Sequence, residues 1–268
     1  MSIQILDHLA DAREALRHHP LEQRVRARLE GAVAVDSRRA VLLWEPRRVV
    51  PIYAVPQDDI HAGLAPGGPV EDPPPGVLHP GVPFAAHTAP GEPVSIGGRA
   101  GAGFRLADPD LPGYVALDFR AFDAWLEEEE PVVGHPRDPF HRVDVRLSSR
   151  PVRVEFEGAV LAETTRARML FETGLPVRYY LPREDVHGEL VSTDAKTYCP
   201  YKGEASYWTL GEHEDIAWSY EDPLPDLPMV KGLVSFWNER VDVIVDGQAR
   251  GRPHGAVADA LRHEFGLK

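Results

Sequence analysis

Residues 151–190 read PVRVEFEGAVLAETTRARMLFETGLPVRYYLPREDVHGEL, and this stretch predicts the fold class. Apolar and charged residues alternate through 152–156, which is the period-2 pattern of a β-strand with one buried face. Glu157-Gly158 provides a turn into a return strand, and further strands are expected at 168–172 and 177–181. Strands so closely spaced, with no long helix between them, indicate an antiparallel sheet sandwich or barrel.

The same pattern occurs a second time, earlier in the chain. Residues 24–64 read RVRARLEGAVAVDSRRAVLLWEPRRVVPIYAVPQDDIHAGL and align with residues 151–190 once a single residue is deleted. Further on, LPGYVALDFRAFDAW (111–125) resembles VKGLVSFWNERVDVI (230–244). This repetition predicts an internal duplication. We therefore expect a mainly β protein made of two tandem small antiparallel β-sheet domains, with short peripheral helices at the termini.

Five segments are expected along the chain. In order, these are an N-terminal helix (1–23), a first repeat (24–130), an ordered linker (131–150), a second repeat (151–250) and a C-terminal helix (251–268). Apolar residues at helical spacing support both terminal helices. Within the first repeat, residues 65–102 are rich in proline and glycine and predict a long loop, and Ala121–Glu130 predicts a short helix.

The charge balance of the 268-residue chain narrows the classes of partner. Its 29 basic and 42 acidic residues give a net charge of −13, which argues against nucleic acid and anionic membranes as partners. No apolar run reaches the roughly 18–20 residues of a membrane span, and the N-terminal residues lack the pattern of a signal peptide. We therefore expect a cytoplasmic protein, and the sequence leaves its oligomeric state open.

The cysteine and histidine content gives little support to metal chemistry. Cys199 is the one cysteine of the chain, which excludes an internal disulfide and a multi-cysteine zinc site. The 12 histidines are scattered and form no HExxH motif. We expect no metal and no cofactor.

Aromatic residues are concentrated in the second half of the chain. It holds six of the eight tyrosines and three of the five tryptophans. It also contains TYCPYKG (197–203), where the first half is expected to have SIGGRAG (95–101), without a thiol, a lysine or an aromatic ring. Tyrosine and tryptophan combine apolar area with a polar tip, which suits the wall of a ligand pocket. We therefore expect the site in the second repeat and treat the first repeat as degenerate.

Several segments of the second half resemble the DUF427 family. They are FEG (156–158), LFE (170–172), RYYLPREDV (178–186), CPYKGEASYW (199–208) and AWSY (217–220). The chain is similar to the long bacterial form with two tandem copies, joined by an HPRDP-type linker (135–139), over about residues 24–250. The resemblance implies a small, mostly antiparallel β fold of the β-tent type. Because this family is sometimes labelled nucleotidyltransferase, the resemblance also implies that type of reaction. The first repeat departs from the family pattern at the CPYKG string, which puts any activity of that repeat in doubt.

Three residues are candidates for catalytic chemistry, and each has a structural alternative. Cys199 is a nucleophile if the nearby Lys202 activates its thiol, or else a small buried apolar residue before a turn. Lys202 could also contact an acidic or phosphorylated ligand, although no Walker A motif is present. Glu172 follows an apolar strand and could have a raised pKa and act as a general acid or base. Its alternative is a structural ion pair with an arginine, for which Arg178 is the obvious candidate.

Two functions remain open from the sequence. In the first, the protein is an enzyme acting on a small polar or aromatic molecule, with Cys199, Lys202 and Glu172 as nucleophile, charge stabiliser and proton carrier. A reaction of the nucleotidyltransferase type is one form of it. In the second, the protein is a small-molecule-binding module without chemistry, whose aromatic cage favours cationic or planar ligands. We favour ligand binding, and either function uses the same binding residues: Arg178, Tyr180, Tyr201, Trp208 and Trp218.

Overall fold

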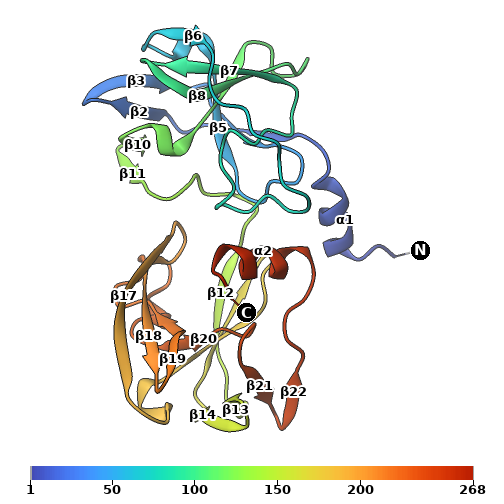
Figure 1. Ribbon diagram of the computed structural model, residues 1–268, viewed down its shortest axis with the longest axis vertical. Coiled ribbons are helices and arrows are strands. Elements are labelled where there is room, and N and C mark those ends of the chain that lie inside the picture. The colour runs from blue at the N-terminus through green and yellow to red at the C-terminus, as the bar shows by residue number, and fades with distance from the viewer. Residues whose placement is uncertain (1, 268) are drawn as a thin grey trace. The chain divides into compact units, whose positions relative to one another are not determined.

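The chain is mainly β, and the computed structural model describes residues 2–267 of it (Figure 1). It divides into two compact units, unit 1 (Met1–Asp138) and unit 2 (Pro139–Lys268). Each unit contains one seven-stranded and one four-stranded antiparallel sheet. Short helices lie near the two ends of the chain, α1 (Ile5–Ala12) and α2 (Ala256–Glu264). Among the helices of the described part, none is long and apolar enough to cross a membrane.

The sheets of unit 1 are built from eleven strands. The seven-stranded sheet has the order β1 (Arg17–Pro20), β4 (Val41–Trp44), β5 (Ile52–Pro56), β9 (Tyr114–Leu117), β8 (Arg99–Leu106), β7 (Gly91–Ile96), β6 (Leu64–Pro66). The four-stranded sheet has the order β11 (Glu130–Val132), β10 (Ala124–Glu127), β2 (Val25–Leu29), β3 (Ala32–Ser37). Of two 3₁₀ turns, η1 (Gln57–Asp59) lies between β5 and β6 of the seven-stranded sheet, and η2 (Phe119–Ala121) lies between β9 and β10 and connects the two sheets.

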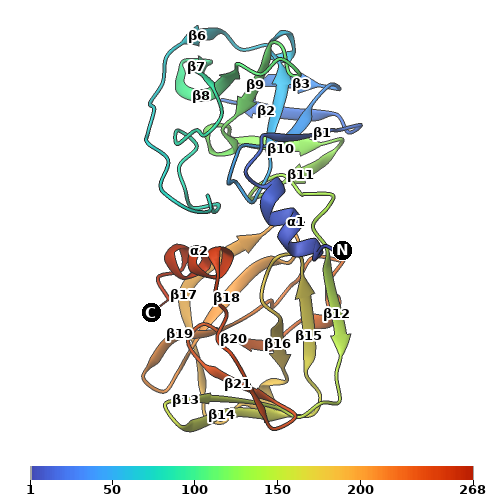
Figure 2. The same ribbon diagram turned by 90° about the vertical axis from the view of Figure 1, so that its right-hand side faces the viewer.

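The sheets of unit 2 are built in the same way (Figure 2). The seven-stranded sheet has the order β12 (Val143–Leu147), β15 (Arg168–Glu172), β16 (Arg178–Leu181), β20 (Val234–Phe236), β19 (His213–Ser219), β18 (Gly203–Leu210), β17 (Leu190–Cys199). The four-stranded sheet has the order β14 (Ala159–Thr164), β13 (Val152–Phe156), β21 (Asp242–Val245), β22 (Gln248–Arg250). The 3₁₀ turns are η3 (Arg183–Asp185) and η4 (Pro228–Val230).

The two units share one strand topology. Replacing β1 to β11 by β12 to β22, in order, converts the sheet orders of unit 1 into those of unit 2. The first hairpin of each four-stranded sheet also turns alike, with φ of 50° and 78° at Glu30-Gly31 and 49° and 82° at Glu157-Gly158. Positive φ at both central residues is the signature of a type I′ turn, which matches the twist of antiparallel strands.

Each seven-stranded sheet has two buried faces. One face packs against the four-stranded sheet and forms the main apolar core of its unit. The other face carries a second apolar cluster. Because side chains alternate along a strand, neighbouring residues belong to different clusters: Tyr179 faces the main core of unit 2, and Tyr180 faces the second cluster.

Some expected elements differ from the structure. The helix expected over Ala121–Glu130 is wrong, because η2 is followed there by the β10–β11 hairpin. Trp125 of this hairpin is buried and pairs with Ala27 of β2, so tertiary pairing outweighs the local helical preference. The long loop, expected over 65–102, is shorter and covers 67–90, since β6 includes its first residues and the β7–β8 hairpin its last ones. The segment 131–150, expected as a linker, includes β12, and the N-terminal segment 1–23 includes β1 after its short helix.

Candidate functional site

The second cluster of unit 2 is an aromatic face on the seven-stranded sheet. Tyr180, Ser235 and Trp218 lie opposite one another on β16, β20 and β19, and directly opposed residues share a face. Around them lie the other rings of the cluster. We call this set the aromatic face: Tyr180, Tyr207, Trp218, Tyr220 and Trp237.

The matching face of unit 1 is mostly aliphatic. Strand pairing gives the correspondence, because Ala54 pairs with Ala116, and Ala116 with Phe104, as Tyr180 pairs with Ser235, and Ser235 with Trp218. In this register, unit 2 has polar or aromatic residues where unit 1 has smaller or apolar ones. The positions in unit 1 are Ile52, Ala54, Phe104, Leu106 and Ala116, and those in unit 2 are Arg178, Tyr180, Trp218, Tyr220 and Ser235.

A buried ion pair lies beside the aromatic face. The turn between β17 and β18 is closed by a hydrogen bond that the backbone N–H of Lys202 donates to the carbonyl of Cys199 (3.2 Å). Gly203 follows with a φ of 98°, a conformation that glycine adopts without strain. This turn places Lys202 Nζ 2.7 Å from both carboxylate oxygens of Glu172, while His141 Nε2 lies 2.9 Å from Oε1. The side chains of Glu172 and Lys202 are only 6% and 11% exposed.

The electrostatics of this cluster keep Glu172 ionised at neutral pH. Burial alone would raise the pKa of Glu172, but the positive charge of Lys202 and the hydrogen bond with His141 lower it to about 2. The carboxylate in turn raises the pKa of Lys202 above its usual value, against the effect of burial. The expectation of a raised pKa at Glu172 is therefore wrong, because the sequence did not reveal these two partners. A proton-carrying role at neutral pH loses its basis.

Arg178 has a different partner from the one expected. Its guanidinium donates two hydrogen bonds to Glu239, at 2.7 and 2.8 Å, and both side chains are buried. The expected pair of Arg178 with Glu172 is not formed. The guanidinium carbon also lies 5.4 Å from the ring of Trp218 and 5.6 Å from that of Trp237. This ion pair therefore fixes two rings of the aromatic face.

The remaining predicted residues near Lys202 are also close to the cluster. Cys199 ends β17, has a partly exposed side chain and forms no disulfide. It is near enough to contribute to the raised pKa of Lys202. The ring of Tyr201 stacks on His141 at 4.5 Å. Tyr180 accepts a hydrogen bond from Trp218 Nε1 (3.2 Å), and burial raises the pKa of its phenol to about 12.

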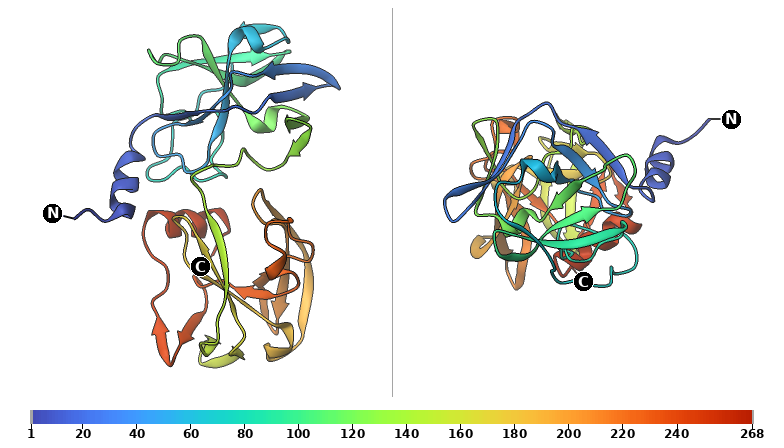
Figure 3. Two further views of the ribbon diagram at one scale, coloured as in Figure 1. Left: turned by 180° about the vertical axis from the view of Figure 1, so that it is seen from behind. Right: turned by 90° about the horizontal axis from the view of Figure 1, so that it is seen from above.

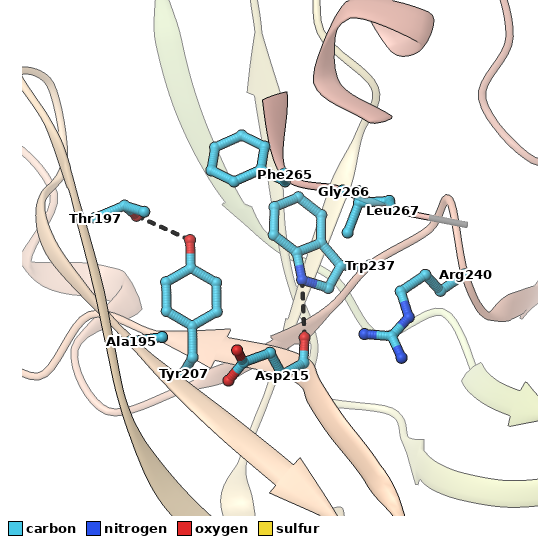
Figure 4. Close-up of a pocket in the computed structure, with 9 residues that line it drawn as sticks. All are labelled: Ala195, Thr197, Tyr207, Asp215, Trp237, Arg240, Phe265, Gly266 and Leu267. Atoms are coloured by element: carbon cyan, nitrogen blue, oxygen red, sulfur yellow. Dashed lines mark hydrogen bonds between the residues drawn. The ribbon is translucent and has the colours of Figure 1, made fainter. Parts of the chain in front are cut away.

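A pocket of about 180 Å³ adjoins the aromatic face (Figure 4). Three rings line it, from β18, from the segment after β20 and from the end of α2. Tyr207 donates to or accepts from Thr197 at 2.8 Å, and Trp237 Nε1 donates to the carbonyl of Asp215 at 3.1 Å. The lining residues are Ala195, Thr197, Tyr207, Asp215, Trp237, Arg240, Phe265, Gly266 and Leu267. None of these residues was predicted as a site residue from the sequence, although Tyr207 and Trp237 are among the aromatic residues concentrated in the second half of the chain.

A comparison with family models finds one match, over residues 144–247, to the family described as "Domain of unknown function (DUF427)". Unit 2 carries a DUF427 domain. The match extends from β12 past β21 and includes Glu172, Lys202 and Cys199. It leaves out His141 and the C-terminal residues that close the pocket. No curated protein matches the chain.

One predicted binding residue lies outside the aromatic face of the DUF427 domain. Trp208 follows Tyr207 on β18 and therefore points to the opposite side of the sheet. There it packs against the main core, donates a hydrogen bond to Ser219 (2.8 Å) and lies under the guanidinium of Arg183 at 4.1 Å. The structure does not bring Trp208 and Trp218 together.

Unit 1 fills the corresponding region with its own loop. The counterpart of the β17–β18 turn of the DUF427 domain is the β6–β7 connection (67–90), so the expected match of SIGGRAG with TYCPYKG is wrong. The alignment of the two repeats was displaced at this point, because the β6–β7 loop is far longer than the β17–β18 turn. His87 of this loop lies 2.9 Å from Glu45, the counterpart of Glu172, and stacks on Phe104 at 3.6 Å. The backbone N–H groups of Thr88 and Ala89 also donate to Glu45.

Among residues 2–267, no group of three or more histidine, cysteine, aspartate or glutamate side chains is placed to hold a metal ion.

Proposed function

We propose that the DUF427 domain of unit 2 binds a small organic molecule in the pocket lined by Tyr207, Trp237 and Phe265. The pocket itself is the observation that carries this proposal: about 180 Å³, three rings, and polar groups from Asp215 and Arg240. A cavity of about 150 Å³ is large enough for benzene, so a ligand with one ring suits this volume. Few, well-placed polar groups in a lining that is otherwise apolar and aromatic are typical of small-molecule sites.

The buried ion pairs support this proposal because they hold the aromatic rings in place. Arg178 and Lys202 are each neutralised by a carboxylate, Glu239 and Glu172. Cations held in this way are poor ligands for a phosphate group, which favours ligand binding over the nucleotidyltransferase reaction. Fixed rings are better binding surfaces than mobile ones, because less conformational entropy is lost on association.

The charge of the chain agrees with a small molecule as the partner. A net charge of −13 disfavours binding to the phosphates of nucleic acid and to anionic membranes. We also propose that the protein is cytoplasmic. An aromatic lining favours planar or cationic ligands among small molecules.

A second candidate function is an enzyme with Cys199 as the nucleophile. The observation in its favour is a partly exposed thiol beside the ammonium of Lys202. A nearby cation stabilises a thiolate, which is the reactive form. Alkylation of Cys199 by iodoacetamide at pH 7 much faster than free cysteine would support this candidate. A rate at or below that of free cysteine would remove it.

Ligand-observed NMR screening of a fragment library against the full chain tests the binding proposal. The same library is screened against Trp237→Leu, which removes a pocket wall. Trp208→Leu is the matched control, since it removes a tryptophan from the opposite side of the same sheet. We expect fragments that bind the wild type and Trp208→Leu but lose binding in Trp237→Leu.

A library without any fragment of this kind would contradict the proposal. Thermal unfolding of both variants shows whether each one is folded under the screening conditions.

A further inference from the structure

Two opposite charges line the pocket without pairing with each other. Asp215 accepts a hydrogen bond from the Thr193 hydroxyl through Oδ1 (2.7 Å), and Arg240 donates through Nη1 to the carbonyl of Glu214 (2.9 Å). In the part of the chain that the structure describes, Arg240 forms no ion pair with Asp215. Figure 4 shows the carboxylate and the guanidinium as separate groups among the lining residues, with the ring of Trp237 beside them.

Asp215 has a second feature that makes this a built site. Its φ is +48°, which few residues other than glycine adopt and which asparagine and aspartate tolerate best. The carbonyl of the same residue accepts the hydrogen bond from Trp237 Nε1. Asp215, with its left-handed backbone, therefore fixes the ring of Trp237 in the pocket wall and supplies the carboxylate next to it.

Resting on the proposed function, we propose that this pocket takes a small zwitterion, a molecule with an ammonium and a carboxylate, such as a free amino acid with an aromatic side chain. The ammonium would bind Asp215, and the carboxylate would bind Arg240, whose planar guanidinium suits that geometry. The side chain would pack on the rings of Tyr207, Trp237 and Phe265, where aromatic contacts have favourable edge-to-face or offset geometries.

The pairing of charges gives the expected order of affinities. A ligand with only an ammonium would shield Arg240 from water without giving it a partner, and a ligand with only a carboxylate would do the same to Asp215. Burying a charged group without a partner costs free energy. A zwitterion satisfies both groups and should therefore bind more tightly than either ligand with a single charge.

Calorimetric titration of the full chain with three related probes tests this order. L-phenylalanine, phenethylamine and 3-phenylpropionate share one ring and differ in their charged groups. We expect L-phenylalanine to bind at least tenfold more tightly than either of the other two. This comparison uses the wild-type protein, so it does not depend on the folding of a variant.

Two variants assign the charges to residues. Asp215→Asn keeps a residue that tolerates the left-handed backbone, and Arg240→Gln keeps a hydrogen-bond donor. Each should weaken L-phenylalanine binding at least tenfold. Asp246→Asn is the matched control for the first, because Asp246 also has a positive φ (54°) and lies outside the pocket. Arg252→Gln, on an exposed arginine outside the pocket, is the control for the second.

The outcomes separate this inference from the proposed function. Equal or tighter binding of a singly charged probe would overturn the zwitterion and leave the pocket in place. Absence of binding by L-phenylalanine would also overturn it, and the fragment screen with Trp237→Leu then decides independently whether the pocket binds any small molecule. Unchanged affinity in both Asp215→Asn and Arg240→Gln would place the ligand elsewhere and contradict the inference.

Discussion

A buried glutamate occupies the same strand position in both units. Glu45 follows β4 and Glu172 ends β15, and both side chains are almost fully buried. Their partners differ, since Glu45 is held by His87, Arg48 and two backbone N–H groups, and Glu172 by Lys202 and His141. At the scale of the residue, these carboxylates tie the β6–β7 loop and the β17–β18 turn to the sheet.

Removing the charge of Glu172 should strongly destabilise unit 2. Glu172→Gln leaves the ammonium of Lys202 buried without an anion, which costs about 3–5 kcal/mol of unfolding free energy. Hydrogen exchange of unit 2 peptides, followed by mass spectrometry, measures this loss. The double variant Glu172→Gln/Lys202→Met should recover part of it. A loss below about 1 kcal/mol would show that the pair is not buried as described.

The same pair predicts how the stability of unit 2 depends on pH. The pKa of Glu172 is lowered from 4.5 to about 2 in the folded state. Its contribution to stability is therefore complete above the unfolded pKa and is lost as the pH falls from about 4.5 to about 2. Unfolding free energies of the wild type and Glu172→Gln, measured across this range, should converge as the pH falls. A constant difference between them would contradict the lowered pKa.

The proximity of site residues could be predicted where chain neighbours are involved, but not where distant strands meet. Cys199, Tyr201 and Lys202 lie on one turn, so their proximity could be predicted from the sequence. Glu239 binds Arg178 across 61 positions, and no local pattern indicates such a pair. Trp208 and its neighbour Tyr207 are both aromatic, so the sequence alone does not tell which of them faces the pocket.

The two units differ in the segment that connects one pair of neighbouring strands. In unit 2 a tight turn joins β17 to β18, whereas in unit 1 the loop 67–90 joins β6 to β7. Phe84 and Ala89 of that loop pack on the second cluster of unit 1. The loop thus covers the face that corresponds to the aromatic face.

His87→Ala should destabilise unit 1 by about 2 kcal/mol. The substitution removes a partner of the buried Glu45 and the ring stacked on Phe104. Hydrogen exchange in peptides of unit 1 measures the effect, and His61→Ala, at an exposed histidine of the same unit, is the control. Equal protection in the two variants would contradict the role assigned to the loop.

The end of α2 closes the pocket of unit 2, so Phe265→Ala should open it. Phe265 packs against Trp237 with ring centroids 5.0 Å apart and the rings tilted by 41°, and its loss exposes the ring of Trp237. We expect a red shift of tryptophan fluorescence and a loss of stability of about 1–2 kcal/mol. Leu147→Ala, at a side chain already 64% exposed, should change neither. An unshifted spectrum in Phe265→Ala would show that this wall does not shield Trp237.

Elements with a period-2 pattern were predictable, and those set by pairing were not. The strand at 152–156 follows directly from alternating apolar residues, and the strand at 168–172 from a short apolar run that ends before the turn Thr173-Gly174. The hairpin of β10 and β11 has an acidic turn, Glu127–Glu130, whose composition equally fits a helix end. Its strand character comes from pairing with β2, about a hundred positions earlier in the chain.

The two units share one strand topology, but the face of the seven-stranded sheet that carries the second apolar cluster differs between them. The shared strand order supports our inference that unit 1 is a divergent copy of the DUF427 domain. Its face is mostly aliphatic and covered by loop 67–90, whereas that of unit 2 is aromatic and adjoins a pocket. We therefore expect one binding site per chain, which calorimetry would report as a stoichiometry of one.

A crystal structure of the full chain soaked with the tightest-binding fragment is the most direct test of the binding proposal. We predict electron density for the fragment against Trp237 and Tyr207, and none against Phe104 of unit 1. An empty pocket at a saturating fragment concentration, or density only at another place on the chain, would contradict the proposed binding site.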